Sequence, residues 1–221
     1  MIRLGSKNAR PTAQIAALTT TQVSKLTATN VGDLLETQIA AFSTAQVQAL
    51  SAGTVIELGS QDVSAQASGA FTGEMSGTML KEFGVRYALV GHSERRQYHG
   101  ETDDVVANKA KAALANGITP IVCIGETLAE REAGQTEAVV KRQLAAVIHA
   151  NGHCISEIVV AYEPVWAIGT GKTASPEQAP AVHAVLRAPL KAASHKADRI
   201  KILYGGSMKA ANAKDLLAQA D

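Results

Sequence analysis

Five short apolar runs, each ending in glycine or a polar residue, place the strongest constraint on how this chain folds. Continuous apolar runs of this length are typical of parallel strands that are buried on both faces. Amphipathic stretches that suit helices separate them, such as 102–116, for which Asn116-Gly117 predicts the end. The runs are 55–59, 87–92, 120–126, 158–163 and 200–207. This alternation predicts an α/β fold with a parallel sheet, either doubly wound or closed into a (β/α) barrel.

Polar or small residues at the carboxyl ends of four runs favour the barrel. His92, Glu126 and Glu163 stand at three of these ends, and Gly-Gly-Ser at 205–207 closes the last. Barrel enzymes collect reactive groups from several strands on one face, whereas a doubly wound sheet concentrates ligand contacts behind a glycine-rich first turn. No G-x-G-x-x-G sequence follows the first run. We therefore expect a (β/α)8-type barrel.

The residue types at these ends predict a reaction class. A buried carboxylate such as Glu163 can remove a proton from carbon, and an imidazole such as His92 can polarise the adjoining carbonyl. The stretch 164–174, Pro-Val-Trp-Ala-Ile-Gly-Thr-Gly-Lys-Thr-Ala, has glycines that can act as hinges and N–H groups that can hold an anion, as a lid does. Residues 205–207 also suit a phosphate. The sequence predicts proton transfer on a small phosphorylated carbonyl compound, with no cofactor and no metal.

Five motifs at these positions form an ordered set along residues 55–221. They are Gly-Ala-Phe-Thr-Gly-Glu at 69–74, Val-Gly-His-Ser-Glu-Arg-Arg at 90–96, Cys-Ile-Gly-Glu at 123–126, Ala-Tyr-Glu-Pro-Val-Trp-Ala-Ile-Gly-Thr-Gly-Lys at 161–172 and Tyr-Gly-Gly-Ser at 204–207. Together they closely resemble the triosephosphate isomerase family. The resemblance implies a TIM (β/α)8-type barrel in the cytoplasm. It also implies interconversion of dihydroxyacetone phosphate and glyceraldehyde 3-phosphate in glycolysis and gluconeogenesis, without a cofactor.

The resemblance also implies roles for single residues. Glu163 would be the base that moves a proton between two carbons, and His92, as a neutral imidazole, would polarise the carbonyl. Gly169 in the lid and Ser207 would bind the substrate phosphate.

Further residues are implied to support this site. Glu94 and Cys123 would stand behind the two catalytic groups, although Cys123 also suits packing as a small apolar side chain. The family's loop around 72–74 reaches the active site of a partner chain, which implies a homodimer. Glu126 remains open between a structural and a functional role.

Composition excludes several other classes. Lys and Arg number 21 against 20 Asp and Glu, and a net charge of +1 argues against a nucleic-acid partner. The two cysteines cannot form a disulfide framework or supply a four-thiolate zinc site. No run of 18 apolar residues occurs, and no apolar leader segment follows residues 1–5. We therefore expect an intracellular protein without a membrane partner.

Residues 1–54 form a second segment with a different sequence pattern. Apolar residues recur there every eight positions in two ladders: Ile15, Val23, Val31, Ile39, Val47 and Val55, and Leu18, Leu26, Leu34, Phe42 and Leu50. Thr19, Thr27 and Ser43 each precede Gln or Asn by three residues, a spacing that predicts capping boxes. We expect short helical turns that stack on one another. The alternative is a low-complexity, partly disordered arm.

Two departures from the family pattern predict a weakened enzyme. The family's first strand ends in Asn-x-Lys, and no such sequence occurs in residues 1–54. Only five of eight strand–helix units are recognisable, and the chain stops before the family's eighth strand and its phosphate-binding Gly-Gly pair. We expect an incomplete barrel with severely reduced isomerase activity. The alternative is a non-catalytic, repeat-bearing interaction protein with a relic barrel.

Overall fold

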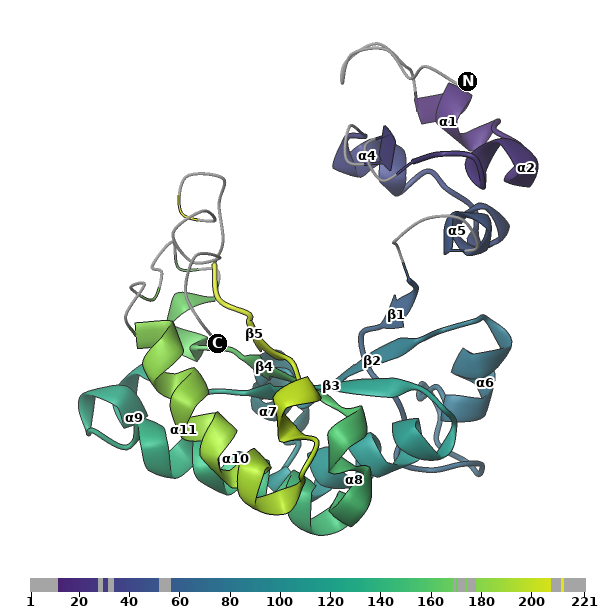
Figure 1. The fold of residues 1–221 in the computed structure, drawn as a ribbon. Helices are drawn as coiled ribbons and strands as arrows, with labels where there is room; N and C mark the ends of the chain where they lie inside the picture. Colours follow the sequence, from purple (N-terminus) through teal and green to yellow (C-terminus); the bar gives the residue numbers. More distant parts are fainter. Residues whose placement is uncertain are drawn as a thin grey trace. The chain divides into compact units, whose positions relative to one another are not determined.

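The computed structural model describes residues 12–27, 30–31, 34–51, 57–168, 170, 174, 178–207 and 212. The chain forms two compact units (Figure 1). Unit 1 comprises Met1–Gly59 and Glu82–Arg86, and unit 2 comprises Ser60–Lys81 and Tyr87–Asp221. Each unit is described separately below.

A five-stranded sheet has its strands in chain order, and neighbouring strands from β2 to β5 run parallel. The strands are β1 (Gly59–Ser60), β2 (Tyr87–Val90), β3 (Thr119–Ile124), β4 (Val159–Tyr162) and β5 (Ile202–Tyr204). Their register places Val90, Val122, Val160 and Ile202 side by side, and all four are buried. The residues that follow β2, β3, β4 and β5 therefore emerge at one edge of the sheet, as expected of a barrel-type fold.

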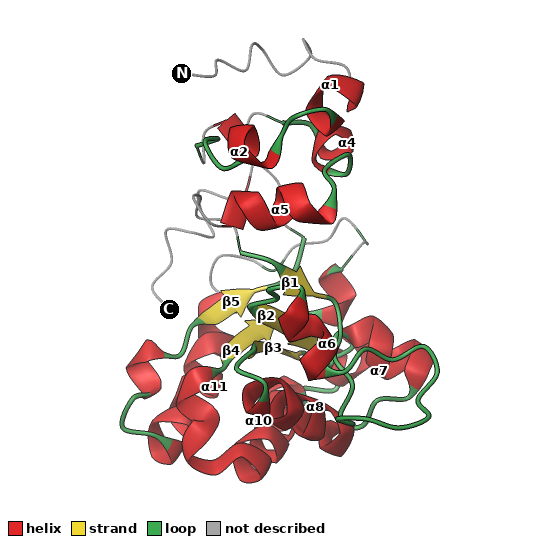
Figure 2. Ribbon diagram, turned by 90° about the vertical axis from the view of Figure 1, so that its right-hand side faces the viewer, coloured by secondary structure: helices red, strands yellow, loops and turns green. Residues whose placement is uncertain are grey.

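Helices cover one face of this sheet. Figures 1 and 2 show α8, α10 and α11 lying side by side against it. Each turns small and branched apolar residues inward, for example Ala110 of α8, Leu144 of α10 and Leu186 of α11. The elements of unit 2 and its borders are α6 (Gly77–Glu82), α7 (Ser93–His99), α8 (Asp103–Ala115), α9 (Leu128–Glu132), α10 (Thr136–Asn151), η1 (Gly152–Glu157), η2 (Val165–Ala167), α11 (Gln178–Ala193) and η3 (Ala197–Arg199).

Most of the expected element positions are confirmed. Helix α8 begins after Thr102, whose side chain accepts the Val105 N–H, and ends at Asn116, followed by Gly117 at φ +69°. Strands β2, β4 and β5 lie within the expected runs, and β3 begins one residue before its run, at Thr119. Of the expected strand at 55–59, residues 55 and 56 lie outside the described residues, Glu57 and Leu58 are not in a strand, and pairing covers Gly59–Ser60. As the edge strand, β1 has a pairing partner on one side only, so little of the run is held in the sheet.

Unit 1 consists of short helices with reciprocal caps. Its helices are α1 (Thr12–Ala16), α2 (Thr20–Val23), α4 (Glu36–Ile39) and α5 (Thr44–Ser51). The three expected capping boxes are confirmed; in the first, the Gln22 N–H donates to Thr19 Oγ1 at 3.2 Å and the Thr19 N–H donates to Gln22 Oε1 at 2.9 Å. The expected short helical turns are thus present in the described residues of this segment.

The repeat of unit 1 encloses a small core of its own. Val23, Leu26, Val31 and Leu50 are buried together. The buried Gln46 Nε2 donates to the carbonyl oxygens of Ala16 and Leu18, so one cap residue also joins two turns far apart in sequence. The apolar ladder fails at Ile39, which is 45% exposed. Val55, at the end of the ladder, lies outside the described residues.

Candidate active site

His92 follows β2 and caps the first turn of α7. Its Nδ1 accepts the Glu94 N–H at 3.2 Å, so in the neutral ring the proton sits on Nε2. The Glu94 carboxylate, which is exposed, lies 3.9 Å from the same Nδ1. The backbone N–H of Glu94 thus fixes which imidazole nitrogen is the donor.

Glu163 follows β4, and its Oε1 lies 3.6 Å from His92 Nε2. Strand β3 separates β2 from β4, so the two side chains meet across the end of β3 rather than at adjacent strand ends. The distance exceeds a hydrogen bond, which leaves the Nε2–H available to another acceptor. Glu163 is only 6% exposed.

Burial raises the pKa of Glu163, although His92, a hydrogen bond from the Cys123 thiol and the Ser93 N–H oppose that rise. A carboxylate with a raised pKa binds a proton more strongly than an exposed one. Glu163 is therefore suited to accept a proton from a weakly acidic C–H bond.

Cys123 lies in β3 with 1% of its surface exposed. Burial, followed by the charge of Glu163, raises the pKa of its thiol. A thiol that keeps its proton is a donor and a packing group rather than a nucleophile. Both sequence interpretations of Cys123 therefore describe the same buried contact with Glu163.

Two glycines allow the backbone to close around Glu163. A Cβ at Gly125 would lie 1.7 Å from the Glu163 carbonyl oxygen, and one at Gly205 would lie 2.8 Å from its Cγ. Neither position has room for a larger residue without displacing Glu163. Gly125 and Gly205, which directly follow β3 and β5, therefore leave the space that Glu163 occupies.

Glu126 holds the start of the stretch 164–174. It is fully buried and accepts hydrogen bonds from Tyr162 Oη at 3.1 Å, Trp166 Nε1 at 3.0 Å and Arg131 Nη1 at 3.1 Å. The Arg131 guanidinium also lies 4.6 Å from the centre of the Trp166 ring, within cation–π range. Glu126, whose role the sequence left open, therefore anchors the start of the stretch that directly follows Glu163.

The end of β5 binds the same stretch at two further points. Ser207 Oγ donates to the Ala167 carbonyl at 2.6 Å, and Tyr204 Oη accepts the Ala174 N–H at 3.1 Å. Ser207 is thus beside the segment that follows Glu163. Gly169, the other residue expected to bind phosphate, lies outside the described residues.

A cavity of about 510 Å³ opens beside Glu163. Its walls include Arg96, Cys123, Gly125 and Gln143, but neither His92 nor Ser207. The cavity therefore adjoins the acid–base pair and does not enclose it. Arg96 is held on its far wall by bonds to the Gly91 carbonyl and to Asp103.

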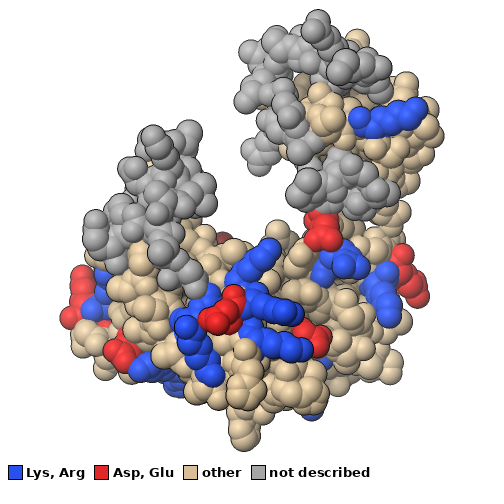
Figure 3. Space-filling view, in the orientation of Figure 1, with Lys and Arg blue, Asp and Glu red and all other residues tan. Residues whose placement is uncertain are grey.

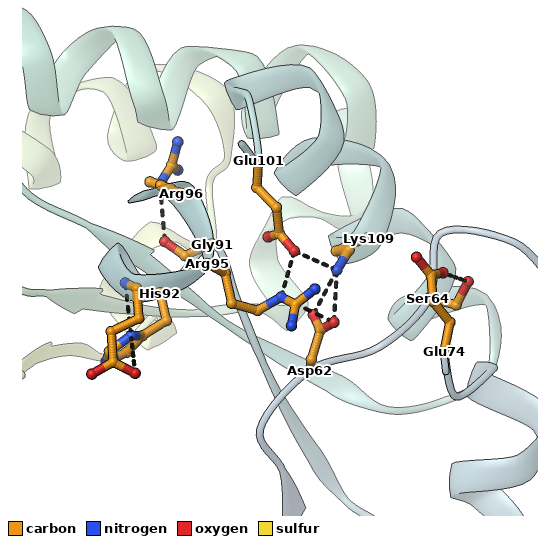
Figure 4. Close-up of polar contacts among 10 residues, drawn as sticks. Asp62, Ser64, Glu74, Gly91, His92, Arg95, Arg96, Glu101 and Lys109 are labelled. Carbon is orange, nitrogen blue, oxygen red and sulfur yellow. Dashed lines mark hydrogen bonds and ion pairs between the residues drawn. The ribbon is translucent and has the colours of Figure 1, made fainter. Parts of the chain in front are cut away.

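A cluster of paired charges supports α7 and α8 (Figure 4). Lys109 Nζ lies 2.7 Å from Asp62 Oδ2 and 2.6 Å from Glu101 Oε1, and Arg95 contacts both carboxylates. Burial alone would raise the pKa of Glu101, but hydrogen bonds from Lys109 and Arg95 outweigh it, so the pKa is lowered. The cluster fixes the helix that His92 caps.

Two further observations concern the described part of the chain as a whole. It brings together no group of three His, Cys, Asp or Glu side chains that could hold a metal ion, and none of its helices is long and apolar enough to cross a membrane. On the face shown in Figure 3, Lys and Arg side chains lie beside Asp and Glu side chains.

Known proteins resemble this chain closely. The family model described as "Triosephosphate isomerase" matches residues 6–221. A triosephosphate isomerase of Paracidovorax citrulli is 78% identical over 162 residues, which are 73% of this chain and 64% of that protein. Those of Delftia acidovorans (77% over 162 residues, 65% of its length) and Cupriavidus necator (62% over 164 residues, 67% of its length) are also similar, each over 73% of this chain.

The match thus spans less than two thirds of the first two relatives. The family model, in turn, covers well over half of this chain. The chain belongs to the triosephosphate isomerase family.

Proposed function

We propose that this chain interconverts dihydroxyacetone phosphate and glyceraldehyde 3-phosphate. The observation that carries the proposal is the pair formed by Glu163 and His92, with Oε1 and Nε2 3.6 Å apart and the carboxylate buried. The names of the relatives supply the substrate class.

Both groups act on adjacent carbons of one substrate. Glu163 removes a proton from the carbon that bears the hydroxyl group, next to the carbonyl. His92 donates a hydrogen bond from Nε2–H to the carbonyl oxygen, where negative charge develops. The resulting enediolate takes a proton from His92 Nε2–H on the former carbonyl oxygen, and the neighbouring hydroxyl group returns its proton to Nε2. Glu163 returns its own proton to the other carbon, so atoms balance and no electron carrier is needed. The backbone N–H of Glu94 donates to His92 Nδ1, so the proton of the neutral imidazole stays on Nε2.

The phosphate is proposed to bind near the end of β5. Ser207 would contribute its hydroxyl group there, and Gly169 a backbone N–H. The contact of Ser207 with Ala167 supports this placement, because it brings the two segments together.

We also propose that turnover is severely reduced. Five strand–helix units and the eight-residue repeat of 1–54 would form an incomplete barrel, without the family's Asn-x-Lys motif. Loss of a cation from the phosphate site costs roughly two to four orders of magnitude in rate. A turnover equal to that of full-length relatives would contradict this proposal.

The assembly and location follow from the same family assignment. We propose a homodimer in the cytoplasm, formed through the loop around 72–74. Phe71 and Met75 beside that loop are both 46% exposed, and exposed apolar side chains of this size are typical of protein interfaces.

A second candidate is a non-catalytic interaction protein. It is favoured by the separate core of unit 1, around Val23 and Leu50, which encloses no reactive side chain among its buried residues. In this interpretation the repeat carries the function and the isomerase residues are a relic.

An assay of the purified full chain with glyceraldehyde 3-phosphate separates the candidates. We expect a low rate above buffer that falls at least a further hundredfold in both variants. Glu163→Asp withdraws the carboxylate from the substrate by one methylene group, and His92→Gln removes the imidazole. The exposed variants Glu132→Asp and His149→Gln are matched controls and keep the rate. No rate above buffer, or a rate that neither site variant changes, would favour the interaction protein.

A further inference from the structure

Gln143 is a buried polar residue of α10 that the mechanism above does not use. It is 6% exposed, and both polar atoms of its side-chain amide bond to a single backbone residue. Its Oε1 accepts the Gly125 N–H at 2.9 Å, and its Nε2 donates to the Gly125 carbonyl at 3.2 Å. Gln143 thereby gives Gly125 the donor and the acceptor that a neighbouring strand residue would supply.

Gly125 needs such a partner because it lies just beyond the end of β3. The register between β3 and β4 ends at Ile124 and Tyr162, and the backbone bonds that continue beyond it are accepted by Ile124 and Glu126 rather than by Gly125. Gly125 is half-buried, and the Gln143 amide gives a hydrogen-bond partner to both its N–H and its carbonyl group. The helix thus completes the hydrogen bonding of the sheet at its carboxyl edge.

Gly125, to which Gln143 is hydrogen-bonded, also packs directly against the backbone of Glu163. The Gly125 Cα faces the Glu163 carbonyl so closely that a Cβ would lie 1.7 Å from that oxygen. On either side of Gly125, the Ile124 carbonyl accepts the Glu163 N–H at 2.8 Å and the Glu126 carbonyl accepts the Val165 N–H at 3.1 Å. A displacement of Gly125 is therefore passed directly to the backbone of Glu163.

The cavity beside Gly125 and Glu163 increases the need for the Gln143 side-chain amide to hold Gly125 in place. Gly125, Gln143 and Glu163 all line its wall. If the amide bonds were lost, Gly125 could move toward open space instead of being held by packed apolar side chains. We propose that Gln143 is a positioning residue: by fixing the Gly125 peptide it sets the distance of the Glu163 carboxylate from His92 Nε2.

This inference rests on the proposed isomerase function, and the full chain tests it. Gln143→Leu replaces the amide with an apolar side chain of similar size. We expect kcat to fall about tenfold to a hundredfold, the effect of moving a base by a fraction of an ångström to an ångström. KM should stay within about twofold, because Gln143 does not contact the substrate in the proposed mechanism. The acid limb of kcat/KM against pH should also shift, because the groups around Glu163 change their distances.

Two further variants keep the test interpretable. Gln143→Glu retains the length of the side chain and the acceptor for the Gly125 N–H, but an ionised carboxylate cannot donate to the Gly125 carbonyl and adds a negative charge. We therefore expect a loss of kcat that grows as pH rises and the new carboxyl group ionises. Gln135→Leu makes the same chemical change at an exposed position just before α10 and should match the wild type. Exchange of the Gly125 amide hydrogen, followed by NMR, should accelerate in Gln143→Leu and not in Gln135→Leu.

Several outcomes overturn the inference. A lowered melting temperature in Gln143→Leu with unchanged kcat and an unchanged pH profile would mean that the amide is only structural. An inactive wild-type chain would instead contradict the proposed function. In that case the titration of the Glu163 carboxyl, followed by ¹³C NMR, decides: a shifted apparent pKa in Gln143→Leu supports positioning, and an identical one contradicts it.

Discussion

The environment of Glu163 is the most informative feature at the scale of single residues. The carboxylate is buried, close to an imidazole and seated on two glycines that leave no room for a Cβ. Burial favours the protonated form of Glu163 and outweighs the opposing effect of His92, so the ionised carboxylate opposes stability. Under the proposed function, a carboxylate that binds protons strongly is the group needed to accept a proton from carbon.

Glu163→Gln should therefore stabilise the protein in a pH-dependent manner. Between the ordinary pKa of 4.5 and the raised pKa in the folded state, the folded chain holds a proton that the unfolded chain has lost. The free energy of unfolding of the wild type thus falls as pH rises through that window, whereas the glutamine variant carries no such term. Urea unfolding should give similar midpoints at about pH 4 and a higher midpoint for Glu163→Gln at about pH 8.

The exposed variant Glu132→Gln is the control and should follow the wild type at both pH values. A Glu163→Gln midpoint below that of the wild type at the higher pH would show that ionised Glu163 stabilises the fold, contrary to the argument from burial.

At the scale of elements, helices α7 and α8 depend on the charge cluster around Lys109. Its ammonium group is 4% exposed and lies between Asp62 and Glu101. Removing one partner of a buried ion pair leaves the remaining charges poorly compensated, which costs more than the pair itself contributes.

Lys109→Met should lower the free energy of unfolding by about 3 kcal/mol near neutral pH, at the lower end for broken buried pairs because Arg95 still contacts both carboxylates. The pKa of Glu101 is lowered, so its contribution is present above pH 4.5 and is lost as pH falls through its folded-state pKa. The cost of the substitution should therefore shrink below that pH.

Urea unfolding over a pH series measures this effect. Lys111→Met on the exposed side of the same helix is the control, with a change within about 0.5 kcal/mol. An equal loss of stability in both variants would assign the effect to helix propensity rather than to the buried cluster.

The sequence was sufficient for elements whose signal is local. Apolar runs located β2 to β5, and Thr102 with Asn116-Gly117 bounded α8, because burial and capping act on neighbouring residues. The same strand ends identified His92 and Glu163. Gln143 gave no signal, because a glutamine within an amphipathic helix resembles a solvated residue until the fold brings Gly125 beside it. The bounds of β1 were missed because pairing at an edge depends on the partner strand.

At the scale of the whole molecule, the two units differ in the size of their cores. The core cluster of unit 1 contains Val23, Leu26, Val31 and Leu50, whereas β3, β4, α8 and α10 of unit 2 all bury apolar residues against one another. Free energies of local opening follow the apolar area that each region buries.

Hydrogen exchange measured by mass spectrometry should therefore give two levels of protection. Amides in α2 and α5 should exchange at least tenfold faster than those in β3 and α10, because less apolar surface holds them closed. Equal protection in both units would show that they unfold as one cooperative body, and would contradict their description as separate units.

The reciprocal caps of unit 1 affect how insertions and deletions in this segment are tolerated during evolution. Each box joins residues three apart, so an eight-residue repeat carries the whole of its own start signal. Gain or loss of one full repeat leaves every remaining cap intact, whereas a shift by any other number of residues breaks the apolar ladders. The spacing within each copy is therefore fixed by its cap, whereas the number of copies between Leu18 and Gln46 is constrained by the bond that joins these two turns.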